Sequence, residues 1–512
     1  MDLLGKLWRG LTARKEVSPW FAVVAAGLFC LALSLVHTTH ELWRDEIHCW
    51  SLGRNATGLW DLLVGDRRYD GHPFLWYYVL HLVSRWSRSE VYLHVVTIVL
   101  ATASAFLWLR DSNLPRVLRV MLLGTYCIFF EYSVISRSYA LGVFLAFLFC
   151  RLYDPRSLRI LRLFVVLVLL SFTSAYGAIL AAALGAFLFW QTVAMLWSSG
   201  LAPRHRRKLY GQGLLGMALG GFALWVHVKT SLPPADALFV KSPGLRPGLL
   251  SPQGFGLRFW AVMFPWNGHN DGTWIVSGFL GDHVPWIKHH LLALATALLA
   301  LWLVALRRAP AVAFALLLGL ASMALFQTYQ YAGFLRHWGH FFVMLVLALW
   351  LFEKCSRRRP ILLYGLAALV MACQIATNAR AIASEVSEPF SGALEAANFL
   401  RARHLENEPI LAIPDHATSP IAGYLDRRFI WPETGTEGQT VVFHNRRRGF
   451  GSHRELLAWA QGTIRDKGRP VLLITSSQLE EGLPTLKTEL LYVTRIALRA
   501  DETFAIYRLT LD

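Results

Sequence analysis

Long stretches of uncharged, apolar sequence constrain this chain more than any other feature. From Leu163 to Pro203 no charged side chain appears. A helix needs about 20 mostly apolar residues to cross a hydrocarbon core of about 30 Å, so this stretch alone has room for two. The chain of 512 residues is 55% hydrophobic with a mean hydropathy of +0.41, a composition that few soluble domains reach. The sequence therefore predicts a polytopic α-helical membrane protein.

Basic residues occur in short clusters between these apolar runs. Such clusters favour the cytoplasmic side of a membrane, which accounts for the net charge of +17 without a nucleic-acid partner. With every cluster on one side, the chain crosses twice between neighbouring clusters. The N-terminus is then cytoplasmic and the C-terminus extracytoplasmic. The clusters are Lys6–Lys15, Arg110–Arg119, Arg151–Arg162, Arg204–Lys208, Arg307–Arg308 and Lys354–Arg359.

This reasoning predicts about eleven transmembrane helices, with outer loops at 39–90 and 231–287. The segment His72–Trp86 is apolar and aromatic but too short to span, and counting it would reverse the sidedness of every later cluster. We expect it to be an interfacial helix. The expected spans are Ser18–Val36, Val91–Leu109, Val117–Tyr132, about Ser138–Cys150, two helices within 163–203, Leu209–Val228, His289–Leu306, Pro310–Gln330, His337–Phe352 and Ile361–Asn378.

After residue 380 the composition becomes that of a soluble domain. Strands are expected at 409–414, 470–475, Leu490–Leu498 and Thr503–Leu509, and helices at Gly392–Arg403 and His453–Lys467. This alternation predicts a small extracytoplasmic α/β domain over 381–512 that follows a transmembrane domain over 1–380. The domain carries no nucleotide-binding fingerprint.

The predicted topology brings unusual polar residues from four chain segments to the outer membrane face. Charged side chains near hydrocarbon are poorly solvated and tend to be functional. Random placement would distribute such residues over both faces, so their convergence predicts a site. The residues are Asp45, Glu46, His48, His72, Glu131, Arg137, Tyr139, Arg336, His337 and His340.

Asp45 and Glu46 follow the first span directly. Neighbouring residues on a helix point about 100° apart, so the two carboxylates do not address one atom. One is a candidate general base toward an acceptor hydroxyl or amine, and the other orients the acceptor or binds a cation. The alternative is helix capping, or a pair with Arg44 at the interface.

Arg137 lies between two mostly apolar spans and therefore has to find an anion or to snorkel toward the interface. Its forked guanidinium suits a phosphate, while an internal ion pair with Glu131 is the alternative. Tyr139 could equally well donate a hydrogen bond to a phosphate or serve as an aromatic residue at the membrane interface. His72 precedes Pro73 at the start of the predicted interfacial helix, where capping is an alternative to substrate binding.

Arg336, His337 and His340 lie at the outer start of a span. The two histidines are three positions apart and share a helix face. They suit a phosphate leaving group, or a divalent metal held together with Asp45 or Glu46. A hydrogen-bonded structural pair is the alternative, so the sequence leaves the metal open.

Three short patterns in the first 140 residues resemble the GT-C superfamily of polyprenyl-phosphate-sugar-dependent glycosyltransferases, especially bacterial members akin to protein mannosyltransferases and the lipid A aminoarabinose transferase. Two departures occur: Phe74 stands where a second proline is common, and Glu131 precedes Arg137 whereas relatives often carry an acid after the arginine. The patterns are Trp43-Arg44-Asp45-Glu46, Asp70-Gly71-His72-Pro73-Phe74-Leu75-Trp76-Tyr77-Tyr78 and Ser136-Arg137-Ser138-Tyr139-Ala140-Leu141.

The resemblance implies an inverting transfer at the extracytoplasmic face of a bacterial inner membrane. The donor would be a sugar on a polyprenyl phosphate, and the acceptor a lipid, a glycan or a protein. Asp45 would be the base, and Arg137 would lie near the donor phosphate.

Two other classes of protein remain as alternatives. A transporter or flippase of polyprenyl-linked or anionic substrates predicts charged residues at mid-membrane and repeat symmetry, whereas these spans are largely uncharged and show no repeat. A non-catalytic envelope scaffold leaves the clustered polar residues of the outer face unexplained.

Overall fold

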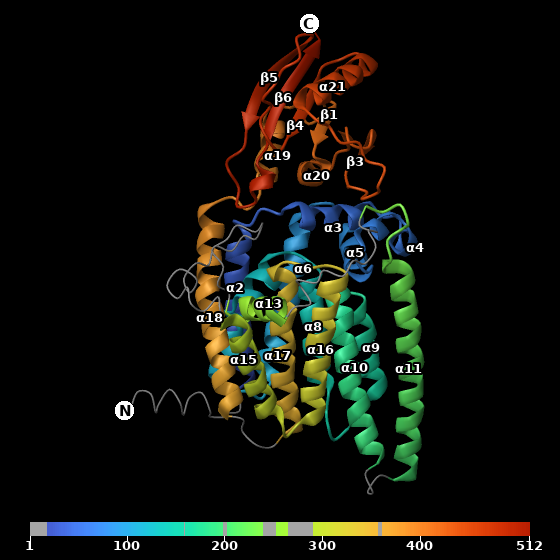
Figure 1. Cartoon of the computed structure of the whole chain (residues 1–512), viewed down its shortest axis with the longest axis vertical. Coiled ribbons are helices and arrows are strands. Elements are labelled where there is room, and N and C mark those ends of the chain that lie inside the picture. The colour runs from blue at the N-terminus through green and yellow to red at the C-terminus, as the bar shows by residue number, and fades with distance from the viewer. Residues whose placement is uncertain are drawn as a thin grey trace, which may run out of the picture.

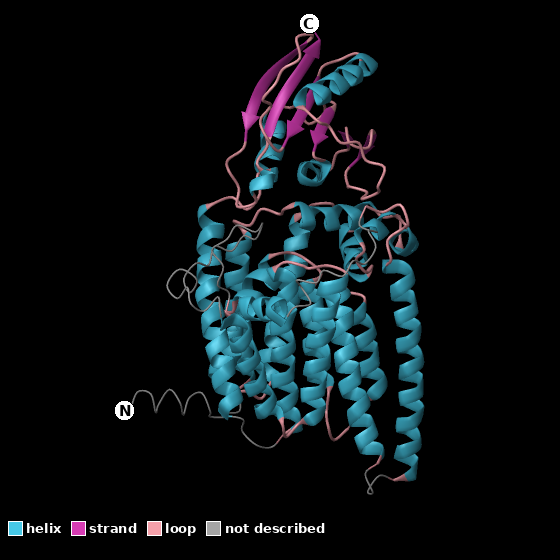
Figure 2. Ribbon diagram, viewed as in Figure 1, coloured by secondary structure: helices cyan, strands magenta, loops and turns pink. Residues whose placement is uncertain are grey.

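The computed structural model describes residues 18–157, 159–197, 202–238, 252–264, 290–356 and 361–511. The chain forms a helical bundle with a small α/β domain seated on one end, which we call the domain side of the bundle (Figure 1). The strands belong to this C-terminal domain (Figure 2). The basic cluster at Lys6–Lys15 and much of the predicted loop at 231–287 lie outside the described residues.

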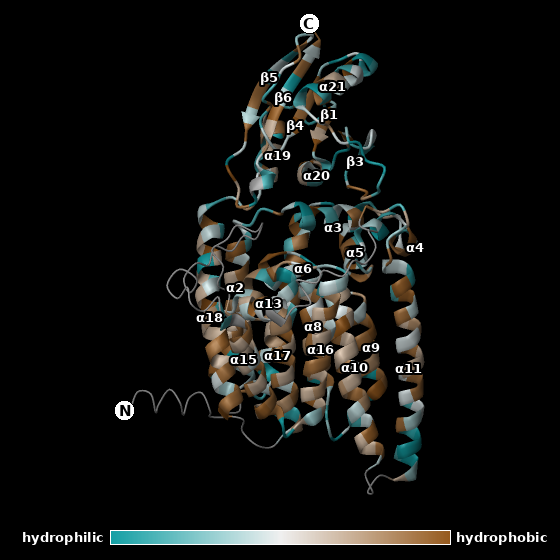
Figure 3. Ribbon diagram, in the orientation of Figure 1, coloured by the Kyte–Doolittle hydropathy of each residue, from teal (hydrophilic) through white to brown (hydrophobic). Residues whose placement is uncertain are grey.

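Seven helices of the described chain are long and apolar enough to cross a membrane, and apolar residues cover much of the bundle (Figure 3). These seven helices support an integral, polytopic membrane protein. They are α2 (Pro19–His37), α6 (Val91–Asp111), α10 (Ala175–Leu196), α11 (Pro203–Ser231), α16 (Pro310–Tyr329), α17 (Leu335–Cys355) and α18 (Ile361–Ser387).

The remaining predicted spans are also helical but are shorter or broken. The segment predicted as one helix over Val117–Tyr132 is instead α7 (Arg116–Leu123) followed by the π-helix η2 (Cys127–Val134), bent by 41°. Gly124 ends α7, and the Thr125 hydroxyl bonds back to the Leu122 carbonyl, which interrupts the ladder. The others are α8 (Tyr139–Leu152), α9 (Ile160–Ser171) and α15 (Leu291–Leu306).

The first predicted outer loop forms a layer of short helices between the bundle and the C-terminal domain (Figure 1). The apolar segment predicted as interfacial contains α5 (Leu75–Ser84), whose ten residues are too few to span. It packs against α3. The other members of the layer are α3 (Arg44–Asn55), α4 (Leu59–Val64) and the 3₁₀ helix η1 (Asp66–Asp70).

The second predicted outer loop is not wholly a loop. It contains α13 (Pro252–Met263), which packs against α15, α17 and α18 inside the bundle. Phe255 and Phe259 of α13 meet the ring of Phe341 on α17, with centroids 5.7 and 6.1 Å apart. Burial of this aromatic face draws the segment into the core.

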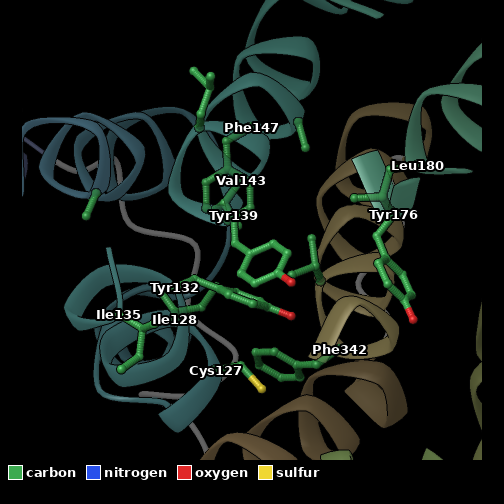
Figure 4. Close-up of a cluster of buried hydrophobic side chains, with 14 of the residues drawn as sticks. Cys127, Ile128, Tyr132, Ile135, Tyr139, Val143, Phe147, Tyr176, Leu180 and Phe342 are labelled. Atoms are coloured by element: carbon green, nitrogen blue, oxygen red, sulfur yellow. The ribbon is translucent and has the colours of Figure 1, made fainter. Parts of the chain in front are cut away.

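Side chains of η2, α8, α10 and α17 pack together in a buried cluster (Figure 4). Tyr132 and Tyr139 lie side by side there with ring centroids 5.4 Å apart, and Cys127 and Phe342 are buried nearby. This core fixes the ends of the helices that carry the site residues described below.

The C-terminal domain is a six-stranded mixed sheet in the order β3-β2-β1-β4-β6-β5. Strand β1 pairs in parallel with β2 and β4, and the other neighbours are antiparallel. The elements are α19 (Ala393–Ala402), β1 (Ile410–Ile413), α20 (Asp415–Leu425), β2 (Phe429–Trp431), β3 (Thr436–Gly438), α21 (His453–Lys467), β4 (Val471–Thr475), β5 (Leu486–Val493), the 3₁₀ helix η4 (Ala500–Glu502) and β6 (Ala505–Leu511).

The sequence analysis missed three elements here: α20, β2 and β3. Helix α20 contains a proline and no regular apolar stripe, and β2 and β3 have three residues each. Strand β5 begins and ends earlier than predicted. Helix α18 continues to Ser387, past Asn378, where the last span was predicted to end.

Helix α20 docks the domain onto the bundle. It packs on α3 so closely that a Cβ atom on Gly423 would lie 2.1 Å from Cγ2 of Ile47. Arg54 of α3 donates to the Gly423 carbonyl at 3.0 Å, and the Tyr424 hydroxyl donates to the Leu42 carbonyl at 3.2 Å. The domain therefore rests directly on the helix that carries Asp45.

Replacing Gly423 with alanine should loosen this contact, because the added methyl group overlaps Ile47 and forces the helices apart. We expect Gly423→Ala to lower the free energy of unfolding by about 1–3 kcal/mol, measured by denaturation of the purified protein. The matched control is Gly462→Ala on α21, where nothing lies within 4 Å of the new methyl group. Equal stability of the two variants would contradict the docking account.

Candidate active site

Asp45 forms ion pairs with two arginines that come from distant parts of the chain. Its Oδ2 lies 2.6 Å from Nη1 of Arg137 and 3.4 Å from Nη2 of Arg336. Asp45 lies in the first turn of α3, Arg137 in the break between η2 and α8, and Arg336 in the first turn of α17. The sequence analysis predicted that these three residues converge, and the structure brings them together.

The three side chains differ in exposure. That of Asp45 is 27% exposed, whereas those of Arg137 and Arg336 are 7% and 10% exposed. Burial disfavours the carboxylate, but the Arg137 and Arg336 guanidiniums outweigh it and hold the pKa of Asp45 well below its usual range. Asp45 is therefore ionised at neutral pH. Its carboxylate is more accessible to solvent than the two guanidiniums with which it pairs.

Arg137 pairs with Asp45 and not with Glu131, the alternative partner considered above. Glu131 is buried within η2 and accepts a hydrogen bond from the Tyr126 hydroxyl, while Arg137 pairs with Asp45. Glu131 is therefore buried inside the bundle, and its pairing with Arg137 is not the one that the structure shows. Tyr139 stays close to the site, with its ring centroid 6.0 Å from Cζ of Arg137.

Glu46 points away from Asp45 and into a buried network. Its carboxylate lies 3.1 Å from Nε2 of His40 and accepts hydrogen bonds from the backbone N–H groups of Trp43, at 3.1 Å, and of Ser136. The other ring nitrogen of His40 lies 3.0 Å from Oε1 of Glu385 on α18. With its oxygens committed to this network, Glu46 does not face the site, contrary to its predicted catalytic role.

His40 is charged at neutral pH because it lies between two carboxylates. Burial disfavours the imidazolium, yet Glu46 and Glu385 together raise the pKa of His40 to about 10. The charged ring ties α3, through Glu46, to the domain-side end of α18, and Glu46 in turn holds the chain at Ser136, next to Arg137. The sequence did not point to His40, because Glu385, the second of its two partners, lies 345 residues away.

His48 lies one turn after Asp45 on α3 and is bound to Asp70. Its Nε2 is 2.9 Å from Oδ1 of Asp70, and Oδ2 of Asp70 accepts a hydrogen bond from the Tyr77 hydroxyl at 2.9 Å. Burial opposes protonation of His48, but the Asp70 carboxylate outweighs it and raises the pKa. Asp70 and Tyr77 both lie in the sequence pattern that runs from Asp70 to Tyr78. That pattern was the signal that could have identified them.

His72 is partly buried nearby, with its Nδ1 2.8 Å from the Asp70 carbonyl. Burial and the Arg137 charge lower the pKa of His72, so it is neutral. The hydrogen bond to the backbone also fits the alternative role of local capping.

His337 and His340 behave as a structural pair. Nδ1 of His337 accepts a hydrogen bond from the Phe334 backbone at 2.9 Å, and Nδ1 of His340 lies 3.1 Å from the Tyr132 hydroxyl. Tyr176 stacks on His340 with centroids 4.7 Å apart. These contacts favour the hydrogen-bonded alternative over a metal or phosphate role.

Within the described residues, the group with metal-like spacing is elsewhere, at Asp415, His416 and Glu433 of the C-terminal domain. Arg447 already bonds both carboxylates there, so the position is occupied by a cation. At the Asp45 site two guanidiniums surround the carboxylate. Neither arrangement favours a divalent cation.

The C-terminal domain completes the site around Trp43. Three guanidiniums contact this buried indole: the Cζ atoms of Arg336, Arg44 and Arg499 lie 5.2, 5.5 and 4.9 Å from its ring. Asp501 pairs with Arg44 and with Arg499. No sequence signal pointed to these domain residues.

The sequence matches no protein-family model and no curated protein.

The buried network of His40 predicts a specific pH dependence of stability. The pKa of His40 is higher in the folded protein than its ordinary value of 6.5, so its contribution is complete below pH 6.5 and is lost as the pH rises through about 10. We expect His40→Gln to destabilise the protein by about 3–5 kcal/mol near neutral pH, because two buried carboxylates lose their cation.

Thermal unfolding in detergent from pH 6 to 10.5 measures this effect. The difference in Tm between wild type and His40→Gln should shrink as the pH approaches 10, whereas His205→Gln at an exposed position should match wild type throughout. A difference that stays constant over this range would contradict a charged His40.

Proposed function

We propose that the protein is a membrane glycosyltransferase of the GT-C type, which moves a sugar from a polyprenyl-phosphate donor to an acceptor. The observation that carries this proposal is the ionised Asp45 held by Arg137 and Arg336 on the domain side of the bundle. Two guanidiniums with one partly exposed carboxylate form a site for an anion and for a nucleophile beside it. The patterns around Asp45, Asp70 and Arg137 support the same assignment.

The arginines suit the donor phosphate. A phosphodiester brings oxygens that match the guanidinium fork, and negative charge grows on the phosphate as its bond to the anomeric carbon breaks. Preorganised cations lower the energy of that transition state. Both arginines are buried, and Arg137 lies by the Tyr139 ring and Arg336 by the Trp43 ring, so they need little rearrangement.

Asp45 suits the acceptor. In the absence of donor it is the counter-ion of both arginines and therefore a weak base. A donor phosphate that binds the guanidiniums takes over their charge, and the pKa of Asp45 rises toward its ordinary value. Donor binding thus prepares the base for the reaction.

The reaction is a single displacement. The acceptor oxygen or nitrogen attacks the anomeric carbon, its proton passes to Asp45, and the sugar–phosphate bond breaks with its electron pair going to the phosphate. Attack opposite the leaving group inverts the anomeric centre. The products are the glycosylated acceptor and the polyprenyl phosphate.

Charge distribution supports an extracytoplasmic site. The clusters at Arg110–Arg119, Arg204–Lys208 and Lys354–Arg359 favour the cytoplasm, which assigns the C-terminal domain to the other side. A polyprenyl-linked donor in the extracytoplasmic leaflet would present its phosphate at the depth of Arg137. We propose the inner membrane of a bacterium as the location.

Transfer from radiolabelled polyprenyl-phosphate sugars by the purified protein tests this proposal. We expect Asp45→Asn to lower kcat/KM by about 10²–10⁴-fold, because the proton acceptor is lost. Asp111→Asn is the matched control, since Asp111 pairs with Arg151 in the predicted cytoplasmic clusters. Transfer by Asp45→Asn at the wild-type rate, or no transfer from any such donor by wild type, would refute the proposal.

A further inference from the structure

The proposed transfer gives no role to His48, which follows Asp45 on α3 by three residues. Residues three apart on a helix are neighbours on one face, separated by about 4.5 Å along its axis. The side chain of His48 is 11% exposed and that of Asp45 is 27% exposed. A molecule bound at Asp45 can therefore also meet His48.

Two contacts fix the ring of His48. Its Nε2 lies 2.9 and 3.0 Å from the two carboxylate oxygens of Asp70, and its ring centroid lies 5.8 Å from that of Phe443 in the C-terminal domain. Asp70 is itself held, because its Oδ2 accepts a hydrogen bond from the Tyr77 hydroxyl. The direction in which Nδ1 points is therefore set by the protein.

The contact with Asp70 also determines where the ring carries its protons. A carboxylate only accepts hydrogen bonds, so Nε2 carries a proton in the neutral ring as well as in the charged one. Burial opposes the charged form, but the Asp70 carboxylate outweighs it and raises the pKa of His48. Asp45 adds to this rise and Arg137 opposes it. The charged ring, in which Nδ1 is also a donor, thus persists to a higher pH than in an ordinary histidine.

One polar atom of each side chain is left without a hydrogen bond. The closest contacts of Asp45 with both arginines use Oδ2, and none of the described residues donates a hydrogen bond to Oδ1. Both bonds of His48 use Nε2, and Nδ1 bonds no residue in the described part of the chain. Neither atom is enclosed by described residues. A free acceptor oxygen and a free donor nitrogen therefore belong to neighbouring side chains of α3.

We propose that His48 binds the acceptor, and that its Nδ1–H donates to an oxygen beside the nucleophile. Oδ1 of Asp45 takes the proton of the nucleophile itself, and the two contacts together orient the nucleophile toward the anomeric carbon. An acceptor with a second oxygen near its nucleophile is then preferred over one with an isolated hydroxyl or amine. Asp70 and Tyr77 are positioning residues that hold the ring. This role rests on the proposed transfer.

Transfer from radiolabelled polyprenyl-phosphate sugars to two small probe acceptors tests this proposal. Ethanol and ethylene glycol differ by one hydroxyl beside the nucleophile, and both are offered together to the full-length, detergent-purified protein near neutral pH. We expect wild type to form about 10-fold more glycol product than ethanol product per hydroxyl, because a charge-assisted hydrogen bond favours the glycol. Equal yields per hydroxyl would overturn the proposal.

His48→Gln separates acceptor binding from a structural role. The glutamine amide can take the place of Nε2 and keep a bond to Asp70, but it places no donor at the position of Nδ1. The preference for ethylene glycol should disappear, while the affinity for polyprenyl phosphate should match wild type because Arg137 and Arg336 are unchanged. An unchanged preference would show that the ring only holds Asp70.

Asp70→Asn is a second variant, which leaves His48 in place and removes the carboxylate that keeps its ring charged. Its preference for ethylene glycol should also fall, whereas His205→Gln, at an exposed position, should keep the wild-type preference. Wild-type preference in either His48→Gln or Asp70→Asn would overturn the proposal. If wild type releases no sugar from any donor, to water or to alcohol, the proposed transfer itself fails. Release of sugar without a preference for the glycol refutes only the role of His48.

Discussion

Two neighbouring carboxylates in the first turn of α3 hold the domain side of this protein together. They point in different directions, so Asp45 reaches Arg137 and Arg336 while Glu46 reaches His40 and the backbone at Ser136. Each carboxylate offsets positive charge that would be costly to bury alone. Asp45 thus belongs to the candidate site, and Glu46 belongs to the buried network behind that site.

The buried network around Glu46 explains how the flexible side chain of Arg137 is held in position. Ser136 precedes Arg137 in the break between η2 and α8, and its backbone N–H is bound by Glu46. A shift of α3 therefore moves Asp45 and the Arg137 backbone together. The C-terminal domain adds a second restraint, because α20 packs on α3 and Arg499 lies against Trp43. Residues of the domain that never touch a substrate can in this way affect the geometry of the site.

Sequence patterns predicted the apolar helices, the short helix α5 and the meeting of Asp45 with Arg137 and Arg336. These features depend on local composition and on the sidedness of charge, which a sequence displays directly. The patterns did not predict α13 inside the bundle, the bend before η2, or the burial of Glu46 and Glu131. Such features depend on tertiary contacts, as with Phe259 against Phe341 and His40 against Glu385.

The central claim is that Arg137 and Arg336 form a phosphate site for which Asp45 competes in the absence of donor. The affinity of the purified protein for a polyprenyl phosphate without a sugar tests it most directly. The account predicts opposite effects: Asp45→Asn frees the guanidiniums and tightens binding about 10-fold, while Arg137→Gln weakens it by at least about 10-fold. Weaker binding by both variants, or unchanged binding by both, would contradict the claim.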